Sequence, residues 1–183
     1  MNFRDLTAED IEVRVQSAKA NGVILLLYKN ARVDMNILDE TVGAENWQRE
    51  HYECKGNLFC RVGIRIKHAV EMQQNAVNFT NDNWVWKADC GTESNTEAQK
   101  GEASDSFKRA CFNWGIGREL YTSPFIWINK ADCGIIESER NGRKTYSCYD
   151  NFEVEKIKIE NKKIVGLAIK NVTTGKRCFV WQP

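Results

Sequence analysis

The chain has 183 residues, of which 42% are hydrophobic, so it is long enough to bury the core of one domain or of a domain with a small annex. Its 26 Lys and Arg against 25 Asp and Glu give a net charge of +1, which excludes a uniformly basic protein. No stretch reaches the roughly 20 apolar residues that cross a bilayer, and the charged start MNFRDLTAED lacks the apolar run of a signal peptide, so we expect a cytoplasmic protein.

The C-terminal part of the chain carries a local surplus of positive charge. Arg140–Pro183 holds ten Lys and Arg against four Asp and Glu, which can attract phosphates, although a solvated lysine face has the same count. The seven cysteines form no CxxC pair and indicate free thiols. The set His51, Cys54, Cys60 and His68 matches no zinc spacing, so we expect no metal and no other cofactor.

The first predicted element is a helix that begins after Thr7. Thr7 is a good N-cap, and Ile11, Val15 and Ala18 recur at helical spacing until an Asn-Gly pair ends the segment. The apolar run VILLLY that follows predicts a buried strand. A second, short helix is predicted over Val33–Thr41, with a glycine as its terminator.

Trp47–His68 changes to a period of two, which predicts a hairpin with its turn at Lys55–Asn57. Alternation along the second strand separates the apolar residues from Arg61, Arg65 and Lys67, which share the other face. That face is either a phosphate-binding surface or an ordinary solvent face.

A polar, Asn- and Gln-rich loop is predicted over Val70–Asn83, and a third strand over Trp84–Cys90. Trp84 and Trp86 share a face of that strand. They could stack on bases, but tryptophans at strand spacing favour a place in the core.

The longest predicted helix covers Glu97–Trp114. Its apolar stripe consists of Ala103, Phe107, Ala110, Cys111 and Trp114. Lys108 and Arg109 border this stripe, with Ser104 and Asp105 one turn before them as residues that can fix the two long side chains. Such a pair can grip phosphates, although most Lys-Arg pairs on helices are only solvated.

The remaining segment is predicted to be rich in strands. FIWI follows Ser123-Pro124, and Asn141-Gly142 marks a hairpin. The tail is predicted to be a meander with turns near Asn161 and Gly175. These elements together predict one α+β domain with a C-terminal β annex.

The run KGEASDSFKRACFNWGIGRELY, with the strand ending in DCGTES before it, resembles the signature of single-strand annealing proteins of the Rad52 superfamily. It is most similar to their bacteriophage, Sak-type branch. The resemblance covers roughly Leu6–Ile128 and includes VILLLYKNARVDMNILDETVG and NWQREH.

This resemblance implies a β-β-β-α fold, in which an antiparallel sheet packs on the long helix. It places an annealing core in residues 1–128 and the β annex, packed on it, in residues 129–183. It further implies assembly into rings or helical filaments and a basic groove that holds single-stranded DNA by its backbone with the bases exposed. If the chain is phage-encoded, the expected location is the host cytoplasm.

The resemblance also points to individual residues. Lys108 and Arg109 match the basic pair of the family's inner groove, whereas Phe112 stands where eukaryotic members have a further basic residue, for which Arg118 is a candidate substitute. Lys19 and Tyr28 are the nearest matches to a basic residue and an aromatic of the groove. The full set of expected DNA contacts is Lys108, Arg109, Arg61, Arg65, Lys67, Arg118, Lys19, Tyr28 and Lys100.

We therefore expect a non-enzymatic protein that binds and anneals single-stranded DNA in recombination and double-strand break repair. The sequence has no GxxxxGK[ST] loop, which fits annealing without ATP. Expected partners are single-stranded DNA, other copies of the chain, a single-strand binding protein and an exonuclease, but no membrane. The alternatives are a passive single-strand coat and, more remotely, a metal-dependent nuclease built on Glu53, Lys55 and Asp39.

Overall fold

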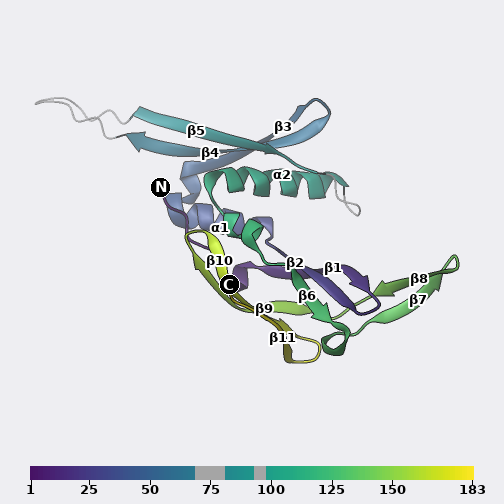
Figure 1. The fold of residues 1–183 in the computed structure, drawn as a ribbon. Helices are drawn as coiled ribbons and strands as arrows, with labels where there is room; N and C mark the ends of the chain where they lie inside the picture. The colour runs from purple at the N-terminus through teal and green to yellow at the C-terminus, as the bar shows by residue number, and fades with distance from the viewer. Residues whose placement is uncertain (69–80, 93–97) are drawn as a thin grey trace, which may run out of the picture. The chain divides into compact units, whose positions relative to one another are not determined.

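The computed structural model describes residues 1–68, 81–92 and 98–183, which fall into two compact units (Figure 1). Unit 1 comprises Met1–Arg4 and Ala31–Ile116, and unit 2 comprises Asp5–Asn30 and Gly117–Pro183. Both units combine antiparallel sheets with helices or short helical turns, and the prediction of a mixed α+β fold is confirmed.

Unit 1 is a three-stranded antiparallel sheet, in the order β3-β4-β5, with two α-helices. Its elements are α1 (Ala31–Val42), η2 (Ala44–Asn46), β3 (Trp47–Cys54), β4 (Asn57–His68), β5 (Asn81–Cys90) and α2 (Ala98–Trp114). The β3–β4 hairpin turns at Lys55-Gly56, where both residues have positive φ (53° and 75°), as a two-residue turn between twisted strands requires. The predicted hairpin is confirmed. The predicted loop 70–83 lies largely outside the described residues.

The long helix α2 lies against one face of this sheet (Figure 1). Phe107, Ala110 and Cys111 are fully buried. The Trp114 indole N–H donates to the Val62 carbonyl at 3.0 Å. The His51 Nε2–H group donates a hydrogen bond to a backbone carbonyl of α2. Apolar burial and hydrogen bonds therefore both fix the rotation of α2 against the sheet.

The end of α2 has two structural causes. Gly115 has φ of 100°, and the Gly115 and Ile116 N–H groups donate to the carbonyls of Phe112 and Cys111, which is the pattern of a Schellman motif. Lys87 Nζ donates to the Asn113 carbonyl at 2.8 Å, so a cation meets the negative end of the helix. The end of this helix that was predicted at Trp114 is confirmed.

Unit 2 is built on a six-stranded antiparallel sheet in the order β11-β10-β9-β1-β2-β6, with β7–β8 as a separate hairpin. Its strands are β1 (Glu12–Lys19), β2 (Gly22–Tyr28), β6 (Ile126–Asn129), β7 (Ile136–Arg140), β8 (Arg143–Ser147), β9 (Phe152–Glu160), β10 (Lys163–Asn171) and β11 (Lys176–Trp181). Short 3₁₀ turns are η1 (Ala8–Asp10), η3 (Arg118–Thr122) and η4 (Lys130–Asp132). The hairpin at Asn141-Gly142 and the C-terminal meander are confirmed.

The predicted N-terminal helix is wrong. Thr7 does form a capping box, but only with the 3₁₀ turn η1, and the chain then enters strand β1. Val13 and Val15 alternate with exposed residues and pair with Leu27 and Leu25 of β2. The tertiary pairing of two β-branched positions outweighs the helical spacing of the apolar residues.

The strands of unit 2 come from both ends of the chain. Strands β1 and β2 share a sheet with β9, β10 and β11, and Glu12 of β1 lies opposite Glu153 of β9. Residues 5–30 therefore belong with the C-terminal strands, because backbone pairing across the sheet joins segments that are far apart in the chain.

Candidate nucleic-acid interface

Lys108 and Arg109 lie on α2, and both side chains are partly exposed. Adjacent helical residues differ by about 100° in direction, so the two cations point to different sides of the helix. Arg109 leans toward β5, where its Nε lies 3.4 Å from the Asp89 carboxylate and 41% of its side chain is exposed. Asp89 therefore orients Arg109, whose side chain stays partly exposed.

Asp105, which lies one turn before Arg109 on α2, binds the segment that follows β5. The Asp105 carboxylate accepts hydrogen bonds from the Thr92 N–H (3.1 Å) and the Thr92 hydroxyl (3.0 Å). It thus connects α2 to the segment that follows β5.

The opposite face of the sheet carries the predicted cationic row. Cys60, Val62 and Ile64 are buried toward α2, while Arg61 and Arg65 lie on the other face. The alternation predicted for β4 is confirmed. The backbones of Lys67 and Lys100 lie in β4 and α2, but their side chains lie outside the described part of the structure.

Arg61 has protein partners on this face. Its guanidinium donates to the Glu50 carboxylate at 2.6 and 3.0 Å, and it lies 4.5 Å from the centre of the Trp86 ring. Glu50 stands directly opposite Arg61 in the β3–β4 register. The cationic row is therefore partly neutralised, which the sequence of β4 alone did not reveal.

The prediction that Trp84 and Trp86 belong to the core is wrong for Trp84, which is 36% exposed, while Trp86 is half-buried. The two rings lie 6.1 Å apart on the face of Arg61. Gly63 lies opposite Trp86, and a Cβ at this position would be 2.8 Å from the indole. Because Gly63 has no side chain, the Trp86 ring can lie on the backbone of β4.

Lys19 and Tyr28 lie at opposite ends of the β1–β2 hairpin, because Lys19 pairs with Gly22 and Tyr28 with Glu12. The structure does not bring this predicted pair together within unit 2. A hydrogen bond to the Glu12 carboxylate, together with burial, raises the pKa of Tyr28. The Tyr28 hydroxyl is therefore occupied within the protein.

Arg118 is exposed at the start of η3, directly after Gly117, whose φ of 72° is left-handed. Arg118 belongs to unit 2 and Lys108 to unit 1. The role of Arg118 as a substitute for the missing basic residue of the groove stays a prediction.

Three residues of unit 1 that sequence reasoning missed are Glu50, Asp89 and Lys87. Each of these side chains contacts a residue of the neighbouring strand or of α2. Only the alignment of these elements in space could have predicted the contacts. A cross-strand register drawn from the predicted β3–β4 turn would have placed Glu50 beside Arg61.

The residues of the nuclease alternative do not form a metal site in the described residues. Asp39 of α1 accepts a hydrogen bond from the Trp47 indole at 2.6 Å, and Lys55 lies in the hairpin turn. No group of three or more His, Cys, Asp or Glu side chains in residues 1–68, 81–92 and 98–183 could hold a metal ion.

The fold and the α2 pair define a candidate nucleic-acid-binding protein with a β-β-β-α unit. Residues 3–133 match the model of the Rad52/22 family of double-strand break repair proteins, and because this match covers more than half of the chain, the protein belongs to that family. Its general role is therefore in DNA repair and annealing. No curated protein and no solved structure matches the chain. None of the described helices has the length and apolar character needed to cross a membrane.

Proposed function

We propose that this protein binds single-stranded DNA and anneals complementary strands without ATP, in homologous recombination and double-strand break repair. The observation that carries the proposal is the Lys108-Arg109 pair on α2, within the family match, where Asp89 orients Arg109 at 3.4 Å. Arginine can fork two phosphate oxygens, and the neighbouring lysine supplies a compact charge.

Annealing by this protein requires no enzymatic step. Base pairing is itself favourable by about 1.4 kcal/mol per base-pair step, provided that the repulsion between the two backbones is neutralised. Lys108 and Arg109 would supply this neutralisation while leaving the bases free. The protein therefore acts as a scaffold, without a catalytic residue or cofactor.

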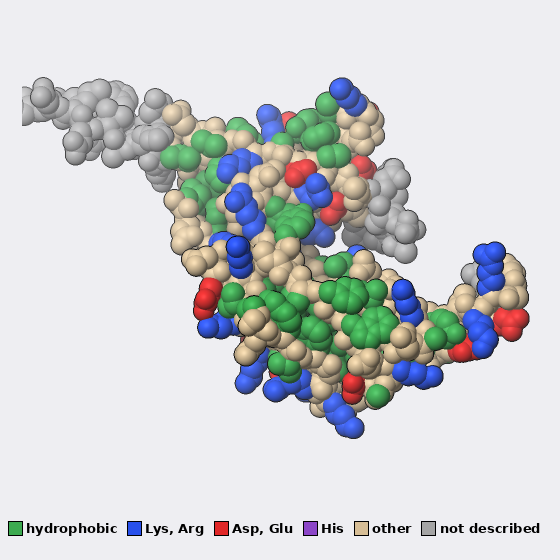
Figure 2. Space-filling view, viewed as in Figure 1, with side chains coloured by type: hydrophobic (Ala, Val, Ile, Leu, Met, Phe, Trp, Pro, Cys, Tyr) green, Lys and Arg blue, Asp and Glu red, His purple; other side chains and the backbone are tan. Residues whose placement is uncertain are grey.

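The proposed core lies within residues 1–128, which include α1, α2 and the three-stranded sheet, while residues 129–183 complete the six-stranded sheet as the annex. We further propose self-assembly into a ring or helical filament, which exposed side chains such as Tyr121 (70%) and Phe125 (71%) support. Figure 2 shows hydrophobic side chains gathered on one face of unit 2. Bacteriophage Sak-type origin, action in the host cytoplasm, and cooperation with a single-strand binding protein and an exonuclease complete the proposal.

The direct test measures the pairing of two complementary, dye-labelled oligonucleotides by energy transfer. The protein should accelerate pairing in the absence of ATP and in the presence of EDTA, because the proposed step uses neither a nucleotide nor a metal. Cleaved strands that appear only when magnesium is added would instead support the nuclease alternative.

A passive single-strand coat is the second candidate function. Trp84 and Trp86 lie with Arg61 on one sheet face, and such aromatic side chains can stack on bases, as a coat would require. The annealing assay separates the two functions. Tight binding that slows pairing would contradict annealing and favour the coat.

Binding should also respond steeply to salt, because the proposed contacts are to phosphates. The slope of log affinity against log salt concentration should be about −0.7 for each phosphate contact on a single strand. Titrations of a labelled oligothymidylate at several salt concentrations measure this slope. A slope near zero would show that the cations of α2 do not hold the DNA backbone.

A further inference from the structure

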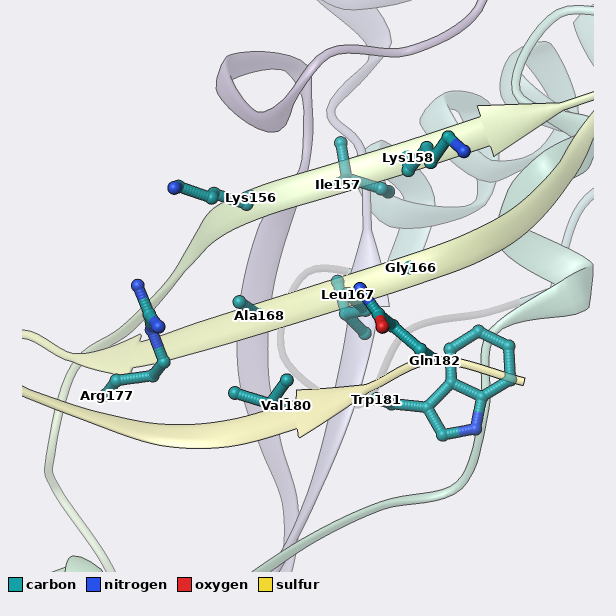
Figure 3. Close-up of a pocket in the computed structure, with 10 residues that line it drawn as sticks. All are labelled: Lys156, Ile157, Lys158, Gly166, Leu167, Ala168, Arg177, Val180, Trp181 and Gln182. Carbon is teal, nitrogen blue, oxygen red and sulfur yellow. The ribbon is translucent and has the colours of Figure 1, made fainter.

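A groove of about 340 Å³ runs along the face of β9, β10 and β11 in unit 2 (Figure 3). Lys156 and Lys158 of β9 line one side, and Arg177 and Val180 of β11 line the other side (Figure 3). All of these residues lie beyond the segment that matches the Rad52/22 family model.

The groove exists because the residues of the central strand, β10, have no long side chains on this face. On β10, Gly166 lies opposite Lys158, and Ala168 lies opposite Lys156 on one side and Val180 on the other. A hydrogen and a methyl group stand between rows of long side chains, so the backbone of β10 forms the floor.

The cations of the groove are accessible to an anion. Lys156 is exposed, and the ion pair of Lys158 with Glu160 is also exposed (71% and 56%), so that solvent weakens it. Arg177 uses Nε and one Nη to bind the Glu155 carboxylate at 2.6 and 2.7 Å. Three of its five N–H donors remain for another acceptor.

Two kinds of anionic polymer fit a basic groove, namely an acidic peptide and a nucleic-acid strand. The position of this groove in the sheet distinguishes between them. An added peptide strand binds at a sheet edge through backbone hydrogen bonds, but β10 is the middle strand, and its backbone is already paired with β9 and β11. An occupant of this face must be held through side chains. A polymer with a phosphate at each repeat fits the row of exposed lysines on β9.

We propose that this groove is a second contact for single-stranded DNA, in which Lys156, Lys158 and Arg177 hold phosphates. The proposal rests on the proposed function, since it assumes that the protein binds single strands. It extends the interface to the C-terminal strands, where the local surplus of basic residues lies.

The test compares Lys156→Glu/Lys158→Glu with a matched control, Lys163→Glu/Lys176→Glu. The control makes the same charge change at exposed lysines that begin β10 and β11, outside the groove lining. Affinity for a fluorescein-labelled oligothymidylate is measured by anisotropy, and circular dichroism checks the fold. The groove variant should bind about tenfold or more weakly than the wild type, and the control should change much less.

Equal affinities of the groove variant and its control would overturn the proposal while leaving the annealing function intact. Failure of the wild-type protein to bind the oligothymidylate would overturn the proposed function itself. If the groove variant keeps its DNA affinity but no longer binds a poly-glutamate probe, the DNA proposal is overturned in favour of an acidic peptide.

Discussion

Replacing Lys108 and Arg109 together by alanine should weaken binding to single-stranded DNA by about tenfold or more for each phosphate that the two side chains hold, because hydrogen bonds to charged groups contribute about 1.5–3 kcal/mol. The effect should be similar for unrelated sequences, since phosphate contacts carry no base information. Anisotropy titrations with several labelled oligonucleotides measure it. The slope against log salt should become shallower in the same variant.

Unit 2 offers a matched control in Arg143 and Lys144, an adjacent, exposed pair in the β7–β8 hairpin. Arg143→Ala/Lys144→Ala removes the same charges and should change the affinity little. Equal effects in the two double variants would show that net charge, and not the α2 site, determines binding. Unchanged affinity of the α2 variant with unchanged circular dichroism would mean that Lys108 and Arg109 are only solvated.

The substitution Phe107→Ala should lower the free energy of unfolding by about 3–5 kcal/mol. Phe107 is fully buried, its ring lies 6.1 Å from that of Trp47, and the Arg49 guanidinium lies 4.8 Å from its centre. Removal of the ring leaves a cavity between α2 and the sheet. Urea titration followed by circular dichroism measures the effect.

Phe125→Ala is the control for this substitution, because Phe125 is 71% exposed and its removal should cost no more than about 0.5 kcal/mol. Similar destabilisation of both variants would contradict the packing of α2 described above. A stable Phe107→Ala protein with normal DNA affinity would show that the orientation of Lys108 and Arg109 does not depend on the packing of Phe107 against the sheet.

Much of unit 1 could be predicted from local signals. Lys55-Gly56 favours a tight turn, and the alternation of β4 fixes which residues face α2. Gly115 marks the end of α2 because its positive φ suits glycine. The site was less predictable, since Arg61 meets Glu50 and Arg109 meets Asp89 across strands or between a strand and a helix.

The sequence by itself determined the β3–β4 hairpin, the extent of α2, the Lys108-Arg109 pair and the family, because periodicity, turn residues and motif spacing are local properties of the chain. Only the tertiary structure decided that β1 is a strand, that Trp84 lies on an exposed face, and that β10 forms the floor of a groove. These outcomes depend on register between distant segments, where the burial of one face and the pairing of backbone groups outweigh local preference.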